Sequence, residues 1–183
     1  MVSKSSKRAI KVIISNYNNL EELQIFFDKV YQTNYPKVIR LCMGYVNGDA
    51  AKAKDLAQEV FIKAWENLGS FRKESGVSTW IYRITVNTCL LQLRNQKIKK
   101  SSNERVLEHI TEEVEENKTT YEVQLKSMYA CINKLSKENK SIILLELEGL
   151  PQKNIAEITG YSHESVRVRI HRIKNELTKC VKL

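Results

Sequence analysis

The sequence predicts an all-α protein made of two small helical domains joined by a flexible linker, the C-terminal domain being a helix-turn-helix. Three observations support this prediction. Only 6 Gly and 2 Pro interrupt the 183 residues, and long stretches repeat apolar residues at helical spacing. Charge is also divided into blocks along the chain. The length suits one medium domain or two small ones, each with a modest core.

The charge blocks define the expected domains. The net charge of +9 favours a polyanionic partner. Basic residues dominate 63–100 and 163–183, whereas seven Glu face only two cations in 101–124. Few large apolar residues occur in this acidic stretch, which predicts a solvated linker. We therefore expect an N-terminal tail (1–20), a helical domain (21–100), an acidic linker (101–124) and a helix-turn-helix domain (125–183).

The four cysteines lie far apart, at Cys42, Cys89, Cys131 and Cys180, with no C-x-x-C pair and no His cluster. We expect free, buried thiols in a reducing cytoplasm, and neither a metal nor another cofactor. No apolar run is long enough to span a membrane, so we expect no membrane insertion. The start of the chain reads as a tail rather than a signal peptide.

Residues 55–68 (DLAQEVFIKAWENL) predict an amphipathic helix. Its apolar stripe comprises Leu56, Val60 or Phe61, Ala64 and Leu68. Asp55, Gln58 and Glu59 gather near the helix start, where negative charge suits the helix dipole. Taken alone, this segment indicates only an ordinary packing helix.

Residues 71–100 predict a polar loop followed by a basic helix. Trp80, Ile81, Ile84 and Leu91 mark the side expected to be buried. Arg83, Asn87 and Arg94 are expected at the surface. A loop of small and hydroxyl residues beside a basic helix with aromatic residues suits single-stranded DNA, where bases stack and phosphates are neutralised. Trp80 itself is better explained as a core residue than as a stacking platform.

The C-terminal segment carries three steric requirements of a helix-turn-helix. Ala156 is small where two helices cross, Gly160 supplies a left-handed turn residue, and Val166 fills the crossing from the second helix. Caps frame these helices. Ser136 and Ser162 are expected as N-caps, Gly149 and Gly160 as helix ends, and Pro151 as a first-turn residue.

The second helix of this motif is expected to bind duplex DNA. Val166, Ile170, Ile173 and Leu177 form its inner stripe. Its exposed N-terminal residues would meet base edges in the major groove, and its later cations would meet phosphates. The residues expected to do so are His163, Glu164, Ser165, Arg167, Arg169 and Arg172.

Together, three segments resemble a bacterial sigma factor of the extracytoplasmic-function (ECF) class. They are DLAQEVFIKAWENLGSF, STWIYRITVNTCLLQLR and LSKENKSIILLELEGLPQKNIAEITGYSHESVRVRIHRIKNEL. The resemblance covers the chain from about Tyr31 to Lys179, apart from the linker, and both domains match in the right order. It implies a region 2-like N-terminal domain and a region 4-like C-terminal domain.

The resemblance also implies roles for particular residues. The helix 55–68 would dock on the clamp helices of the largest subunit of core RNA polymerase, through Asp55, Gln58, Glu59, Ile62 and Trp65. The loop 71–79 and the helix after it would open the downstream promoter element, with Asn87 helping to read a flipped base. The downstream-element residues would be Phe71, Arg72, Ser75, Ser78, Thr79, Arg83, Asn87 and Arg94. The C-terminal domain would bind the upstream element and touch the flap of the second-largest subunit, and an anti-sigma factor is a further expected partner.

Two other functional classes make different predictions. A free-standing helix-turn-helix regulator is the alternative, and it predicts a palindromic site and tight binding without polymerase. It gives no role to residues 55–68 and 71–100. The three histidines, His109, His163 and His171, lie in the linker or on the basic helix. Because no nucleophile with a base, paired-carboxylate site or phosphate loop is apparent, we expect no enzyme.

Overall fold

The computed structural model describes residues 20–71, 76–102 and 120–181, and this part of the chain is helical with no strand. The all-α prediction is therefore confirmed. Three long helices form an N-terminal unit: α2 (Leu20–Tyr45), α3 (Ala50–Asn67) and α4 (Val77–Ser102). A short 3-10 turn, η1 (Leu68–Ser70), ends α3. The C-terminal unit comprises α5 (Thr120–Lys134), α6 (Lys137–Leu147), α7 (Gln152–Thr159) and α8 (His163–Cys180).

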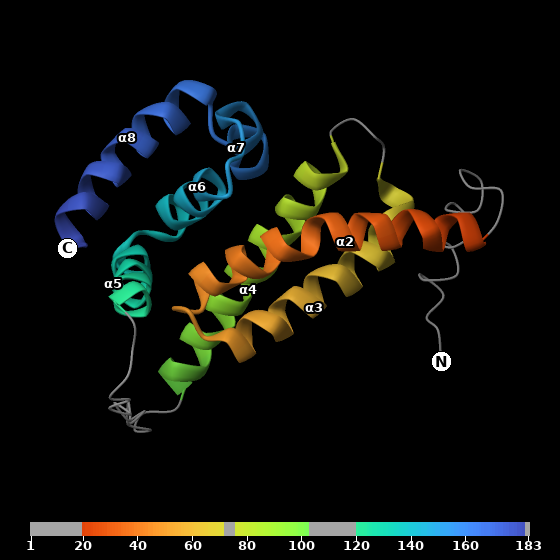
Figure 1. Ribbon diagram of the computed structural model, residues 1–183, viewed down its shortest axis with the longest axis horizontal. Coiled ribbons are helices and arrows are strands. Elements are labelled where there is room, and N and C mark those ends of the chain that lie inside the picture. The colour runs from red at the N-terminus through yellow and green to blue at the C-terminus, as the bar shows by residue number, and fades with distance from the viewer. Residues whose placement is uncertain (1–19, 72–75, 103–119, 182–183) are drawn as a thin grey trace.

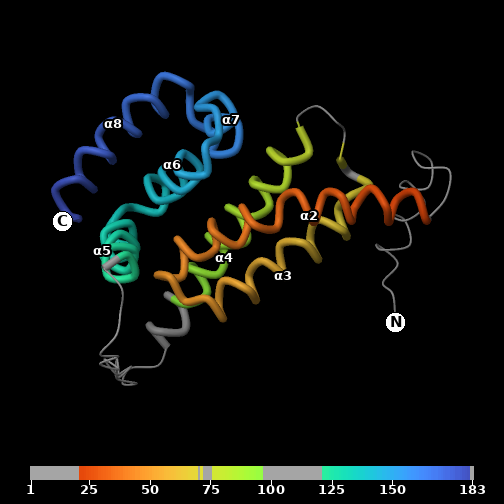
Figure 2. Tube along the Cα trace, viewed as in Figure 1, coloured from red at the N-terminus to blue at the C-terminus, as the bar shows by residue number. Residues whose placement is uncertain are grey.

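Figure 1 shows α2, α3 and α4 packed against one another, with α5 to α8 beside them. Helix α7 lies against α4, and α6 and α5 each contact α2. Helix α8 contacts α5, α6 and α7 and lies on the far side of the C-terminal unit from the N-terminal helices (Figure 2). The two units therefore meet through α7, α6 and α5, while α8 faces outward.

Local sequence signals explain where these helices begin and end. Asp49 caps α3 by accepting a hydrogen bond from the backbone N–H of Lys52, which lowers the pKa of the Asp49 carboxyl. The turn before it uses left-handed backbone at Asn47 and Gly48. Inside α3, the expected apolar stripe is buried, which confirms that prediction. Its buried members include Leu56, Val60, Phe61 and Ala64, with Leu68 just beyond the helix.

The two units share one hydrophobic core rather than two separate ones. At their junction Gly44 of α2 packs so closely on Leu144 of α6 that a Cβ on Gly44 would lie 2.2 Å from Leu144 Cδ2. Next to it, Tyr45 Oη donates a hydrogen bond to Ser141 Oγ (2.7 Å), and both residues are buried. This part of the junction therefore excludes solvent as a domain interior does.

Two sequence-based expectations are wrong in this structure. Cys131 and Cys180 form a disulfide, so only Cys42 and Cys89 are free, buried thiols as expected. The expectation of free thiols rested on the wide spacing of the cysteines and on a reducing cytoplasm, and neither of these reports that α5 and α8 bring two Cα atoms to 5.9 Å. Leu91 is 41% exposed because it lines an open cleft rather than the core, whereas Ile81 is buried as predicted.

Only part of the expected linker and of the two ends of the chain belongs to the described residues. Helix α4 continues to Ser102 and α5 begins at Thr120, so both enter the stretch assigned to the linker. Residues 103–119 and the tail residues 1–19 lie outside the described part of the chain. No described helix has the length and apolar character needed to cross a membrane. The described residues also contain no cluster of three or more His, Cys, Asp or Glu suited to a metal ion.

Candidate nucleic-acid interface

The C-terminal unit contains a well-formed helix-turn-helix made by α7 and α8. Gly160 ends α7 with a φ of 78°, a left-handed conformation that glycine adopts without strain. Ser162 caps α8 by accepting a hydrogen bond from the backbone N–H of Ser165 (3.2 Å). Ala156 and Val166 are both buried at the crossing. The three steric requirements read from the sequence are therefore met in the structure.

The predicted upstream-element residues on α8 divide into two groups. His163, Glu164, Arg167 and Arg172 are exposed on its outer face. Arg169 is half-buried: its guanidinium carbon lies 4.5 Å from the centre of the Tyr161 ring, and Nη1 donates to Asn139 Oδ1 (3.0 Å). Its Nε also donates to Ser165 Oγ (3.3 Å). Arg169 and Ser165 therefore help to hold α6, α8 and the turn together.

Two of the α4 residues predicted to bind the downstream element form hydrogen bonds with α7. Arg83 Nη2 donates to the backbone carbonyl of Glu157 (3.0 Å) and to its carboxylate (3.2 Å). Asn154 Nδ2 donates to the hydroxyl of Thr79 (3.3 Å), which is buried. Helix α7, the first helix of the helix-turn-helix, thus contacts part of the surface that is expected from the sequence to bind the melted strand.

The other downstream-element residues lie at or beyond the edges of this contact. Phe71 is half-buried against Trp80, their ring centres 5.2 Å apart, and Ser78 is half-buried in the first turn of α4. Asn87 and Arg94 are exposed along α4. Arg72 and Ser75 lie outside the described residues. Trp80 belongs to the rim of the core, as the sequence favoured.

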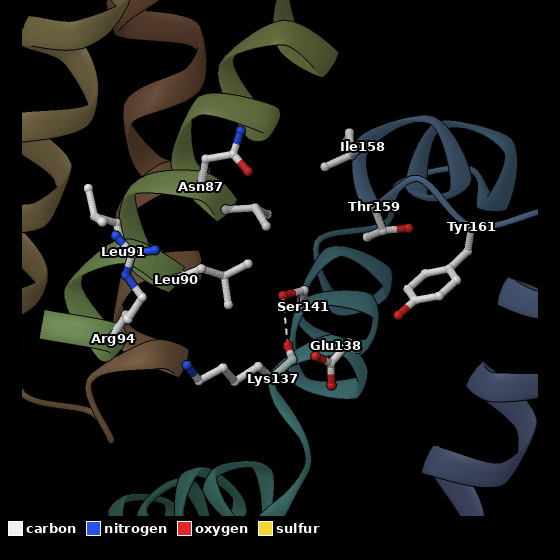
Figure 3. Close-up of a pocket in the computed structure, with 11 residues that line it drawn as sticks. Asn87, Leu90, Leu91, Arg94, Lys137, Glu138, Ser141, Ile158, Thr159 and Tyr161 are labelled. Carbon is white, nitrogen blue, oxygen red and sulfur yellow. Dashed lines mark hydrogen bonds between the residues drawn. The ribbon is translucent and has the colours of Figure 1, made fainter. Parts of the chain in front are cut away.

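A cleft of about 420 Å³ is lined by residues of α4, α6, α7 and the turn after α7 (Figure 3). Leu90 and Leu91 supply apolar surface from the α4 side, and Ile158 and Tyr161 supply it from the other side. Charged and polar groups complete the lining. They are Asn87, Arg94, Lys137, Glu138, Ser141 and Thr159. The cleft is therefore an apolar slot with a charged rim, formed jointly by both units.

The predicted polymerase-binding residues share the outer face of α3. Asp55, Gln58 and Glu59 are exposed, and Glu59 pairs with Lys63 (2.6 Å). Two large apolar side chains follow on the same face, Ile62 at 58% and Trp65 at 40% exposure. The Trp65 ring is held edge-on by Phe27 of α2, with ring centres 5.0 Å apart. Exposed apolar side chains bordered by charged residues are typical of a protein-binding surface.

Sequence reasoning missed the polar contacts between the two units. Arg40 of α2 donates to both carboxylate oxygens of Glu148, at the end of α6, from Nε (2.9 Å) and Nη2 (2.7 Å). The hydrogen bond with Glu148 raises the pKa of Arg40. Nearby, the hydroxyl of Tyr82 is buried without a hydrogen-bond partner, and burial raises its pKa to about 12. No local pattern could pair residues 108 positions apart.

These features define a DNA-binding protein of two helical units, with a helix-turn-helix in the second. Comparison with known families identifies both units. Residues 30–98 match Sigma-70 region 2, and residues 125–177 match Sigma-70, region 4. RNA polymerase sigma factor YlaC of Bacillus subtilis is 33% identical over 131 residues, covering 69% of this chain and 76% of that protein. The ECF RNA polymerase sigma-E factor of Haemophilus influenzae is 31% identical, covering 94% and 87%.

Solved structures agree on the fold. The sigma factor RpoE of Bartonella quintana, in complex with the anti-sigma factor NepR, superposes with a TM-score of 0.68 at 22% identity, covering 86% of this chain and 97% of that one. CnrH, in complex with the cytosolic domain of CnrY, gives 0.66 at 17% identity over 96% and 93%. The chain belongs to the ECF sigma factors. As a member of this family it is a transcription initiation factor rather than an enzyme.

Proposed function

We propose that this sigma factor binds core RNA polymerase, binds the upstream promoter element through α8, and recognises and opens the downstream element through α4 and the loop before it. The observation that carries the proposal is that α8 exposes arginine side chains to solvent while its apolar residues are buried against the rest of the C-terminal unit. Arg167 and Arg172 are exposed on α8, whereas Val166 and Ile170 are buried. Cations on the outer face of such a helix suit phosphates beside the major groove.

Polymerase contacts are proposed at two surfaces. The first is the outer face of α3 with Ile62 and Trp65, which would bind the clamp helices of the largest subunit. The second is an apolar groove of about 490 Å³ between α5, α6 and α8, which would receive the flap of the second-largest subunit. Its lining includes Leu125, Met128 and Leu177. Apolar grooves between helices commonly receive amphipathic helices.

Downstream-element binding requires the two units to separate. The Thr79 hydroxyl is buried against Asn154 of α7, and Arg83, whose side chain is 42% exposed, is bonded to Glu157, so a DNA strand would have to displace α7 from both residues. The arrangement described above is therefore a closed form, and core polymerase would stabilise an open one by binding α3 and the groove at separate places. A ligand shifts such an equilibrium only through its greater affinity for one of the two states.

An anti-sigma factor is the second proposed partner. The two similar solved structures are sigma factors in complex with NepR and with the cytosolic domain of CnrY. In this chain, the cleft of Figure 3 offers apolar surface from both units, including Leu91 and Tyr161. A segment bound in this cleft would contact α4, α6 and α7 at once and would favour the closed form.

In vitro transcription tests the central proposal. Purified protein is added to core polymerase together with a template that carries the DNA upstream of the gene for this protein. Run-off transcripts are then measured. We expect a specific transcript that depends on the added protein. Arg167→Ala should reduce use of templates that depend on the upstream element, and Asn87→Ala should change the preferred downstream sequence. Specific DNA binding by the protein alone, with no transcript from any promoter, would instead support a free-standing regulator.

A further inference from the structure

The two cysteine pairs of this protein lie in different surroundings. Cys42 and Cys89 are buried in the N-terminal unit, with sulfur atoms 3.8 Å apart and no bond between them. The hydrogen bond with Cys42 and burial raise the pKa of the Cys89 thiol, which disfavours its thiolate form. Cys131 and Cys180, in contrast, are bonded across α5 and α8 of the C-terminal unit.

In the second pair, one sulfur is accessible to small molecules, and the other is close enough to react with it afterwards. Cys180 is the last residue of α8 and is only half-buried, whereas Cys131 is 5% exposed. Lys134 Nζ lies 3.9 Å from Cys180 Sγ. An ammonium group at this position stabilises a thiolate, which is the nucleophile of thiol chemistry.

The bond joins two walls of the groove between α5, α6 and α8. On α5, Met128 of the groove lies one turn before Cys131, and on α8 Leu177 lies one turn before Cys180. Val181, which directly follows Cys180, also lines the groove. The link therefore limits how far α5 and the end of α8 can separate at this end of the groove.

We propose that Cys131 and Cys180 are a reversible thiol–disulfide modification site that sets the rigidity of this groove. A peroxide is the proposed oxidant. The Cys180 thiolate attacks one peroxide oxygen, the O–O bond breaks, and water leaves after protonation, giving a sulfenic acid. The Cys131 sulfur then attacks the Cys180 sulfur, and a second water leaves as the disulfide forms. Two equivalents of a small thiol reverse the step by two exchanges and are themselves oxidised to a disulfide.

Trapping experiments on the full-length protein test the chemistry. The protein is reduced with dithiothreitol, desalted, treated with hydrogen peroxide, alkylated under denaturing conditions and digested for mass spectrometry. We expect the Cys131–Cys180 peptide pair to be linked while Cys42 and Cys89 are recovered alkylated. Subsequent incubation of the native protein with reduced glutathione should remove the link. Failure of peroxide to form the link, or its survival in millimolar reduced glutathione, would overturn the proposal.

Hydrogen exchange tests the effect on the groove independently of any partner. Backbone amides of α5 around Leu125–Cys131 should exchange several-fold more slowly in the oxidised protein than in the reduced one. Cys131→Ser should exchange at the reduced rate with or without peroxide. Cys42→Ser is the matched control, and it should keep the difference between the two states. Equal α5 exchange in oxidised and reduced protein would contradict control of the groove.

The consequence for polymerase rests on the proposed function. An isolated flap domain of the second-largest polymerase subunit should bind the oxidised protein several-fold more tightly, because a pre-organised groove loses less freedom on binding. Equal affinity for both forms would remove this consequence. If the flap domain binds neither form, the flap contact fails, but trapping and hydrogen exchange still decide whether the site is a switch.

Discussion

Arg40 and Glu148 connect the two helical units of this sigma factor through a bidentate ion pair between α2 and the end of α6. The Glu148 side chain is 9% exposed and the Arg40 side chain 55% exposed, so the pair is shielded on one side only. Its position beside Tyr82 and the Gly44–Leu144 contact makes it part of the closed form.

Breaking the ion pair should weaken the closed form modestly. In a double-mutant cycle of Arg40→Ala and Glu148→Ala, we expect a coupling free energy of about 1 kcal/mol, because Arg40 is largely solvated. Denaturant unfolding measures it. The charge swap Arg40→Glu with Glu148→Arg should recover most of the stability that Glu148→Arg alone loses. A coupling energy of zero would show that the pair contributes nothing to the junction.

Adding a methyl group at Gly44 should force the two units apart or strain them. Gly44→Ala places a Cβ within 2.2 Å of Leu144 Cδ2, and overpacking of this kind costs about 1–3 kcal/mol. Small-angle X-ray scattering should show a larger radius of gyration, or thermal unfolding a lower midpoint. Combining the change with Leu144→Ala should relieve part of the effect.

Gly76→Ala is the control for this prediction, since the nearest neighbouring atom to a Cβ there is 4.0 Å away. It should leave both scattering and melting unchanged. If the Gly44→Ala variant had the same radius of gyration and the same unfolding midpoint as the wild type, the close contact with Leu144 would be contradicted.

Two arginines on the same helix should behave differently when removed. Arg169→Ala loses contacts with Tyr161, Asn139 and Ser165, so we expect about 1–2 kcal/mol of lost stability as well as weaker DNA binding. Arg167→Ala removes an exposed side chain and should change stability by less than about 0.5 kcal/mol. Thermal unfolding and filter binding to upstream-element DNA separate the two effects. Equal destabilisation by both changes would contradict the division of roles on α8.

Alkaline pH should destabilise the protein partly through Tyr82. Its pKa is raised from 10.0 to about 12 in the folded protein, so the unfolded chain loses this proton first. The stabilisation is present below pH 10 and is lost as the pH rises from 10 to 12, by about 2–3 kcal/mol. Tyr82→Phe should abolish that part of the loss while keeping neutral-pH stability, because the hydroxyl has no hydrogen-bond partner.

Denaturant unfolding at several pH values measures the Tyr82 effect. Tyr121→Phe, a change at a tyrosine that is 71% exposed, serves as the comparison and should follow the wild-type curve. Identical curves for Tyr82→Phe and wild type above pH 10 would refute the assignment.

Local rules predicted the helix-turn-helix well and the junction not at all. Gly160, Ser162 and Val166 each satisfy a requirement set by residues only a few positions away, so a single sequence can reveal them. The junction depends on shape and charge matched across distant segments, as at Gly44 and Leu144. No spacing rule relates such residues, and their fit exists only after both units have folded.

The candidate site shows the same division. Helical periodicity correctly placed Asn87 and Arg94 on the surface of α4, since alternation between core and solvent is a property of one helix. It could not indicate that α7 would cover Arg83. The disulfide was missed for a similar reason, because Cys131 and Cys180 are 49 residues apart and meet only through the packing of α5 on α8.

The matched junction has a consequence for engineering promoter specificity by exchanging domains between sigma factors. A C-terminal unit from another member would bring its own residue opposite Gly44 and its own charge opposite Arg40. A bulky or mismatched pair there would alter the resting state of the hybrid even if both DNA-binding surfaces were intact. Such hybrids should keep the native arrangement of the two units if the transplanted C-terminal unit retains Leu144 and Glu148 of the recipient and only the helix equivalent to α8 is exchanged.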